Sequence, residues 1–350
     1  MSSWDHRQHM PNLQGKIALV TGGNGGIGYQ SVVFLAKAGA KVYFGARSTE
    51  RAEAACNKMY RENPSVRPGQ ITWLHMDMAD MKSIRVGCDK LRETESRLHI
   101  LINNAAHEGT EPSKIVDPGV QVTMQTNHVG VFSLTQRLQP LLRAAAKEKD
   151  SDVRIVMVRI ALFILRPPTQ RHKLKADASN VPGIDFSNPH GGDLVYPSGQ
   201  SLAKDDGFMA CMKRYSVSKM ALNLQASELQ ARYDKEGVPI LVVSVCPGTV
   251  WTPGTRRAVP WSLYPIFWLK SYSEITGPKP VLFAAVSPEV REQERYFKGQ
   301  FINRSHRVIR GHPATHSAVL AKELWLSTEE LVSEFNQKYR EGREGSDGVL

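Results

Sequence analysis

The sequence has little cysteine, and what it has is not arranged to bind a metal or to form a disulfide framework. Its four cysteines lie far apart, with no CxxC spacing: Cys56, Cys88, Cys211 and Cys246. This spacing argues against a metal site and against a disulfide-stabilised fold, and it fits a reducing compartment. We therefore expect no metal and a cytoplasmic location.

Long apolar runs are absent as well. The longest, residues 155–165, is interrupted by Arg159 and is shorter than the roughly 20 residues that a membrane-spanning helix needs. Residues 1–12 are polar and contain no apolar core of the kind found in secretory signals. We expect no transmembrane segment.

Acidic residues are outnumbered by basic ones, 34 against 45, which gives a net charge of +11. The basic clusters, such as residues 166–175 and 304–310, are short, and the sequence contains no motif that reads a nucleic-acid groove. A nucleic-acid or acidic-membrane partner is one interpretation of the charge. A basic enzyme with an anionic cofactor explains it more simply, so we expect no nucleic-acid partner.

What the sequence does contain is an alternation of apolar β-branched runs with helix-like segments. The predicted strands are 16–21, 41–46, 71–76, 99–103, 154–158 and 239–245, and the predicted helices are 28–37, 49–61, 81–95, 119–147 and 208–233. Runs that are apolar throughout are typical of strands buried on both faces of a parallel sheet. The pattern predicts an α/β fold, a doubly wound parallel (Rossmann) sheet in three α/β/α layers. We expect residues 1–350 to form a single domain with its core in residues 14–339.

Two regions interrupt this alternation. Residues 166–206 are rich in Pro, Gly, Ser, Asn and Lys and predict a long loop. Residues 250–280 carry Pro253, Pro260, Pro265 and Pro278 around the apolar-aromatic segment 261–269. That segment is open to three interpretations: a substrate lid, ordinary core, or a shallow contact with a membrane surface.

A glycine-rich loop, residues 21–28 with the sequence TGGNGGIG, joins the first strand to the first helix. Glycines at such a turn let the backbone approach phosphates, and the helix N-terminus offers free N–H groups and a positive dipole end. The loop therefore predicts a dinucleotide site. Its candidate binding residues are Gly22, Asn24, Gly26, Ile27 and Gly28.

Tyr215 and Lys219 are four residues apart in a helical segment and so share a helix face. A phenol with a pKa of about 10 is a poor proton shuttle at neutral pH, and a nearby ammonium favours the phenolate. The pair is thus a candidate for proton transfer. The alternative is a Tyr and a Lys on an exposed helix face.

These motifs together resemble those of the classical short-chain dehydrogenase/reductase family over residues 14–339. The matching segments, in order, are 21–28, 103–106 (NNAA), Asn127, Tyr215-x-x-x-Lys219 and 247–252 (PGTVWT). Residues 237–252 and 284–289 further resemble the retinol-dehydrogenase-like branch and its fungal relatives. The resemblance implies that Tyr215 delivers a proton to a carbonyl oxygen while hydride arrives from a nicotinamide, and that Lys219 holds the ribose hydroxyls.

The resemblance also implies roles for five further residues. Asn104 contacts the adenosine ribose, Asp77 bonds the adenine amino group, and Asn127 links Lys219 to solvent through a water. Val250 and Thr252 contact the carboxamide or the phosphates. The bland alternatives are a helix N-cap for Asp77, a capping or helix-kinking residue for Asn127, and a plain turn for residues 247–252.

Cofactor preference depends on the end of the second strand. NAD-specific sites usually place an acidic residue there for the ribose hydroxyls, whereas this chain has Arg47, followed by Ser48 and Thr49. A guanidinium can bind a 2′-phosphate bidentately, so we expect NADP(H). The alternative is an ion pair between Arg47 and Glu50.

The family pattern breaks after the fifth predicted strand, where a catalytic serine is expected and Arg159-Ile160 stands instead. Loss of one such donor typically lowers the rate by about 10²–10³. Three explanations compete. Another group, with Arg159 nearest, replaces the serine. The protein binds NADP but turns over poorly. The third explanation is that residues 159–171 are an artefact of the gene model. The family usually has a His-Lys-Leu sequence a few residues after the serine, and here that sequence appears at 172–174, after the unusual segment.

The sequence supports two classes of function. The first is an NADP(H)-dependent oxidoreductase that interconverts a carbonyl and an alcohol on an apolar substrate, such as an intermediate of secondary metabolism. The candidate pocket residues are Trp261, Leu263, Tyr264, Phe267 and Trp268. The second is a catalytically impaired NADP-binding regulatory or scaffold homologue. The resemblance also allows a homo-oligomer without fixing the number of subunits.

Overall fold

A computed structural model of the 350-residue chain describes residues 4–107, 114–159, 185–190, 208–259, 261–310 and 313–347. The predicted loop 166–206 therefore lies outside the described residues, apart from 185–190. Most of the segment 159–171 also lies outside them.

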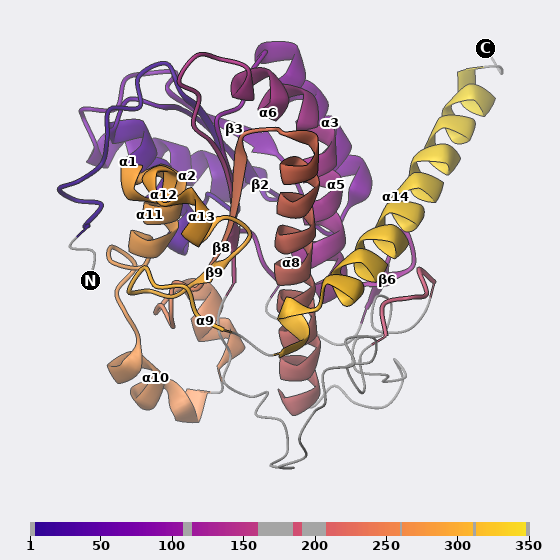
Figure 1. The fold of residues 1–350 in the computed structure, drawn as a ribbon. Coiled ribbons are helices and arrows are strands. Elements are labelled where there is room, and N and C mark those ends of the chain that lie inside the picture. The colour runs from indigo at the N-terminus through magenta and orange to yellow at the C-terminus, as the bar shows by residue number, and fades with distance from the viewer. Residues whose placement is uncertain are drawn as a thin grey trace.

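A seven-stranded parallel sheet forms the centre of the fold, with the strand order β3-β2-β1-β4-β7-β8-β9 (Figure 1). Its strands are β1 (Ile17–Thr21), β2 (Lys41–Ala46), β3 (Ile71–His75), β4 (Ile100–Asn103), β7 (Val153–Val158), β8 (Ile240–Val245) and β9 (Phe301–Ile302). The order reverses between β1 and β4, which is where ligands of doubly wound sheets bind. The predicted fold class is confirmed, and the six predicted strands begin and end within one residue of the observed ones.

Helices cover both faces of the sheet (Figure 1). One face carries α1 (Gly26–Lys37), α2 (Thr49–Glu62), α11 (Lys279–Val286) and α12 (Pro288–Glu292); the other carries α3 (Met81–Thr94), α5 (Gly130–Arg137), α6 (Gln139–Ala146) and α8 (Phe208–Glu236). Successive strand residues point to opposite faces, so Ala18 and Val20 pack under α1 while Leu19 packs under α3 and α8. Every residue of β7 and β8 is buried, as a sheet covered on both sides requires.

The single helix predicted over residues 119–147 is wrong. The segment begins with a hairpin and continues as broken helix: β5 (Ile115–Val116), β6 (Val120–Gln121), α4 (Val122–Met124), the π-helix η1 (Gln125–Val129), α5 and α6. Gly119 has φ +101°, which no helix accepts, and Pro140 lacks the N–H that a continuous helix would need from it. The residue after the π-helix, Gly130, has no room for a side chain, because a Cβ there would lie 2.4 Å from the carbonyl oxygen of Met78.

The sequence analysis assigns no element beyond residue 245, and the structure places several there. They are α9 (Pro253–Ala258), η2 (Trp261–Leu263), α10 (Tyr264–Lys270), α11, α12, α13 (Glu294–Phe297), β9, η3 (Pro313–His316) and α14 (Ala318–Asp347). The long helix α14 lies across the outer side of α8 (Figure 1). Trp325 of α14 stacks edge-on against Phe132 of α5, with ring centroids 4.8 Å apart.

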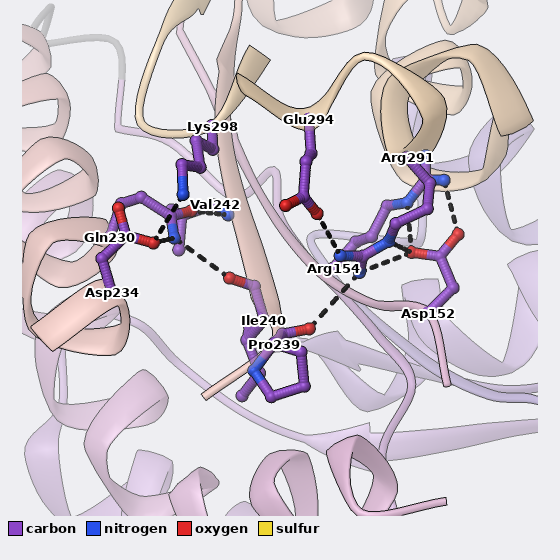
Figure 2. A network of polar contacts seen from close by, with 10 residues as sticks. All are labelled: Asp152, Arg154, Gln230, Asp234, Pro239, Ile240, Val242, Arg291, Glu294 and Lys298. Atoms are coloured by element: carbon purple, nitrogen blue, oxygen red, sulfur yellow. Dashed lines mark hydrogen bonds and ion pairs between the residues drawn. The ribbon is translucent and has the colours of Figure 1, made fainter. Parts of the chain in front are cut away.

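A polar network closes the end of the sheet at which β7 and β8 begin (Figure 2). Asp152 accepts hydrogen bonds from Arg154 and Arg291, and the buried Arg154 also donates to the carbonyl oxygen of Ala284, at 3.1 Å. Burial alone would raise the pKa of Asp152, but the two guanidinium groups hold it below its usual value. The side chain of Gln230 in α8 bonds two backbone groups of β8: it donates to the carbonyl oxygen of Ile240 and accepts the amide of Val242. The network fixes the strands at the edge opposite their carboxyl ends.

Candidate functional site

The glycine loop turns sharply at the carboxyl end of β1. Gly22 has φ +65°, and its amide donates to the carbonyl oxygen of Gly45 at 2.8 Å. A Cβ on Gly28 would lie 2.3 Å from the carbonyl oxygen of Gly22, so only glycine lets α1 start this close to the strand. By contrast, a Cβ on the exposed Gly25 would meet nothing within 4 Å. The N-cap of α1 is Gly25 and has no side-chain cap, which leaves the first amides of the helix available to an anion.

Thr21 joins the glycine loop to the end of β4. Its buried hydroxyl accepts the backbone amides of Asn104 and Ala105, at 2.9 and 3.0 Å. In return, the side-chain amide of Asn104 donates to the carbonyl oxygen of Thr21 at 2.9 Å. The predicted residue Asn104 therefore holds the start of the glycine loop against the end of β4. Thr21 is a positioning residue that the sequence analysis missed, and its only signal was a hydroxyl at the last position of a buried strand.

Tyr215 and Lys219 lie on α8 and are both buried, with 5% and 3% of their surface exposed. The Lys219 ammonium lies 5.6 Å from the centroid of the Tyr215 ring and donates to the carbonyl oxygen of Val158 at 3.3 Å. The interpretation of the pair as residues on an exposed helix face is therefore wrong. Val158 is the last residue of β7, so the pair lies at the carboxyl edge of the sheet.

Asn127 lies in the π-helix and is completely buried. Its carbonyl oxygen accepts the backbone amide of His107, and its amide group donates to the carbonyl oxygen of His107 and to the hydroxyl of Ser218. Ser218 in turn donates to the carbonyl oxygen of Tyr215 at 2.8 Å. Asn127 thus connects the loop after β4 to the helical turn that carries Tyr215 and Lys219. Ser218 was not singled out from the sequence.

Arg159 continues β7 beyond its last residue. Its guanidinium carbon lies 4.1 Å from the centroid of the Phe301 ring. Burial lowers the pKa of the Arg159 guanidinium, and its interactions with Cys246 and Tyr215 oppose that effect. Its buried Nε and Nη1 atoms have no hydrogen-bond partner among the described residues. The side chain therefore interacts electrostatically with Tyr215, and two of its donors have no partner among the described residues.

Arg47 and Asp77 follow β2 and β3 at the same edge of the sheet. Arg47 is exposed and forms none of the ion pairs that the structure describes, while Glu50 accepts a hydrogen bond from Ser48. The alternative pairing of Arg47 with Glu50 is not observed. Asp77 accepts the amide of Ala79 at 3.0 Å, and the N-cap of α3 is Asp80, not Asp77.

Val250 and Thr252 follow β8 and face the glycine loop. Thr252 is the N-cap of α9, and its hydroxyl accepts the amide of Thr255 at 3.1 Å. Its methyl carbon lies 3.0 Å from where a Cβ on Gly26 would be, so the two loops meet directly. Val250 is buried, and its carbonyl oxygen accepts the hydroxyl of Thr255. The hydrogen bonds within this segment are those of a turn, as the alternative interpretation of residues 247–252 expected. The same turn also borders the glycine loop that precedes α1.

Arg304 holds the turn after β8 in place. It donates to the carbonyl oxygens of Pro247 and Thr276, at 3.0 and 2.9 Å, and its guanidinium carbon lies 3.5 Å from the centroid of the Tyr272 ring. The ring also abuts Gly248, where φ is +75°. No sequence signal pointed to Arg304, because its partners are backbone carbonyls far away in the chain.

The segment 261–269 is not core. No residue of η2 or α10 is buried, and Trp261 and Trp268 are 83% and 64% exposed. The expected pocket residues Leu263, Tyr264 and Phe267 are half-buried. The substrate-lid interpretation stays a prediction.

The described residues contain neither a helix that could cross a membrane nor a cluster that could hold a metal ion. No helix among them is long and apolar enough to cross a membrane. No group of three or more His, Cys, Asp or Glu side chains among them could hold a metal ion.

The chain resembles known proteins both in sequence and in fold. The model of the short chain dehydrogenase family matches residues 16–159. The match ends at the residue where the family pattern breaks. Among solved structures, a complex of RhlG with NADP from Pseudomonas aeruginosa has a TM-score of 0.53 at 24% identity, over 83% of this chain and 95% of that one. An uncharacterized protein from Mycobacterium Paratuberculosis has a TM-score of 0.65 at 23% identity, over 95% and 98%.

Two fungal proteins are closer in sequence. The short-chain dehydrogenase/reductase pyiH of Pyricularia grisea is 62% identical over 250 residues, which cover 69% of this chain and 93% of that protein. The short chain dehydrogenase/reductase dpchH of Colletotrichum higginsianum is 36% identical over 322 residues, 92% of this chain and 76% of that protein. With the Rossmann sheet and the ordered motifs, these matches show that the chain belongs to the short-chain dehydrogenase/reductase family.

Proposed function

We propose that this oxidoreductase is NADP(H)-dependent and interconverts a carbonyl and an alcohol on an apolar substrate. The observation that carries the proposal is the buried pair Tyr215 and Lys219 at the carboxyl edge of the sheet, tied to Val158. A phenol beside an ammonium, at the edge where nucleotides bind, is suited to proton transfer at a carbonyl oxygen.

The residues around the glycine loop fit a dinucleotide. The open position at Gly25 and the uncapped start of α1 suit its phosphates. Arg47, which has no ion pair among the described residues, would take a 2′-phosphate, and Asp77 and Asn104 would bind the adenosine half. Gly22, Asn24, Gly26, Ile27 and Gly28 would form the cradle, with Val250 and Thr252 closing it. When bound, the nicotinamide would supply or accept the hydride.

We assign Tyr215 as the proton donor to the substrate oxygen. The ammonium of Lys219 stabilises the phenolate that remains after transfer, and it would also hold the ribose hydroxyls. Asn127 is the third residue of this group. It acts through its bonds to His107 and Ser218, which fix the turn of α8 that presents Tyr215.

Arg159 is the group available where the family has a serine. A guanidinium beside Tyr215 would stabilise negative charge on a substrate oxygen, although two of its donors are buried in this arrangement. If nothing replaces the serine, the alternative is an NADP-binding regulatory or scaffold protein. Sequencing mature transcripts across codons 159–171 tests the third explanation: an unaltered reading frame there excludes a gene-model artefact.

The substrate class follows from the apolar residues after Thr252. Half-buried Leu263, Tyr264 and Phe267 lie on the segment that begins beside the glycine loop. They favour a lipid-derived, terpenoid or polyketide carbonyl, which is consistent with a role in secondary metabolism.

A direct test measures NADPH absorbance while the full chain is offered a panel of such carbonyls. The proposal expects turnover on at least one of them, with NADPH used in preference to NADH. A parallel thermal-shift titration with each nucleotide shows whether the cofactor binds. Binding of NADPH without turnover on any member would favour the scaffold alternative, and no binding of either nucleotide would reject both.

A further inference from the structure

Exposed apolar side chains gather on one short segment of the surface. The structure describes ten exposed large hydrophobic residues, and six of them fall between residues 261 and 275. We define the α10 patch as Trp261, Ile266, Trp268 and Leu269, which are 83%, 53%, 64% and 78% exposed. Single exposed apolar residues are ordinary, whereas several on one short segment point to an interaction surface.

The segment that carries the patch is held at one side only. The hydroxyl of Tyr264 donates to the carbonyl oxygen of Arg256 at 2.6 Å, and its ring packs edge-on against Trp251 at 5.4 Å. Among the described residues, no side-chain hydrogen bond or ring contact involves Trp261, Ile266 or Trp268. Helix α10 projects from the lower end of the molecule, away from the sheet (Figure 1). The contacts of Tyr264 therefore hold the segment to the protein, while the α10 patch faces outward.

The charged residues of the segment that carries the α10 patch are mainly basic. Residues 251–273 contain three basic residues, Arg256, Arg257 and Lys270, all exposed, and no acidic one; the half-buried Glu274 follows. Tryptophan and leucine flanked by basic side chains are suited to the boundary between lipid headgroups and acyl chains. The patch therefore combines apolar contact with attraction to an anionic surface.

We propose that the α10 patch docks this protein on the surface of an anionic phospholipid bilayer, without crossing it. A second copy of the chain is a poorer occupant, because it would bring Arg256, Arg257 and Lys270 of both copies together. Docking does not depend on the proposed function. Since Thr252 is the N-cap of α9 and lies beside the glycine loop, docking would also bring the candidate site near a membrane-dissolved substrate, and this consequence does rest on the proposed function.

The test is co-sedimentation of the full chain with phosphatidylcholine vesicles, with and without phosphatidylserine, at low and high salt. Trp268→Glu/Leu269→Glu removes the apolar contact. Val319→Glu/Leu326→Glu is the matched control, because it changes two residues of α14 that are 42% and 48% exposed. Thermal unfolding of each variant verifies that it folds.

Wild type and control are expected to pellet with phosphatidylserine vesicles at low salt, with a blue shift of tryptophan emission. The α10 variant should bind at least about 10-fold more weakly. High salt should weaken wild-type binding. The proposal is overturned if wild type stays in the supernatant or if both variants bind alike. It is also overturned if light scattering shows a wild-type dimer that Trp268→Glu/Leu269→Glu converts to a monomer.

Discussion

At the scale of single residues, the proposed preference for NADP(H) depends on Arg47. The side chain is exposed at the end of β2, beside the glycine loop, and has no ion pair among the residues that the structure describes. Its position could be predicted from the sequence, because the residue that follows a strand is easily located in a parallel α/β pattern. Its lack of a partner was not, because that depends on where Glu50 points.

Replacing Arg47 should weaken NADPH binding selectively. Arg47→Ala removes a charge-assisted contact to the 2′-phosphate, for which about 1.5–3 kcal/mol is typical, so the dissociation constant should rise by roughly 10- to 100-fold. NADH binding should change little. Isothermal titration with both nucleotides measures this, with Arg61→Ala at the far end of α2 as control. Equal losses for NADPH and NADH would count against the assignment.

The buried side chain of His128 makes the free energy of unfolding depend on pH. It is completely buried, accepts or donates a hydrogen bond with Thr328 at 2.9 Å, and burial lowers its pKa to about 3. The unfolded chain would titrate this group near pH 6.5. Between about pH 6.5 and 3, the unfolded state binds a proton that the folded state excludes, so the stabilisation present above pH 6.5 is lost as the pH falls.

His128→Gln should therefore flatten the pH dependence of the free energy of unfolding. Each excluded proton contributes a slope of about 1.4 kcal/mol per pH unit, and the variant should lose this share between about pH 6 and 4. Urea unfolding across that range measures it. His9→Gln, at an exposed position, is the control and should keep the wild-type slope. An unchanged slope in His128→Gln would refute the account.

At the scale of elements, sequence patterns located the strands that bear the site and four helices, α1, α2, α3 and α8. They did not locate the broken helix within 119–147 or the elements after residue 245. The buried strands are short apolar runs, which are hard to mistake. The sequence did not reveal the π-helix around Asn127, because the bonds of Asn127 to His107 and Ser218 join residues far apart in the chain. The two-residue strand β9 is too short to give a pattern, and its place follows from pairing with β8.

Helix α14 gives the sharpest test at this scale. Trp325 is 3% exposed between Phe132 and Arg232, whereas its neighbour Leu326 is 48% exposed. Trp325→Ala should lower the free energy of unfolding by about 3–5 kcal/mol, and Leu326→Ala by less than about 0.5 kcal/mol. Urea denaturation followed by circular dichroism compares them. Similar effects of the two substitutions would mean that α14 does not dock on α5 and α8 as described.

At the scale of the whole molecule, the candidate site combines groups from the ends of six strands, β1, β2, β3, β4, β7 and β8. The sequence could name Tyr215, Lys219, Asn104 and Asn127, because each belongs to a recognisable motif. It could not show that Thr21 and Ser218 hold them in place, because these bonds join residues 83 and 91 positions apart. The single-domain organisation, the homo-oligomer and the origin of residues 159–171 stay predictions.

The central claim is that Tyr215 transfers a proton beside a bound nicotinamide. The most direct test is the rate of NADPH consumption by Tyr215→Phe on the best carbonyl substrate of wild type. General acid catalysis typically contributes about 10²–10⁴ in rate, so turnover should fall by about that factor. The rise in melting temperature on adding NADPH should persist. Turnover by Tyr215→Phe at the wild-type rate would contradict the claim.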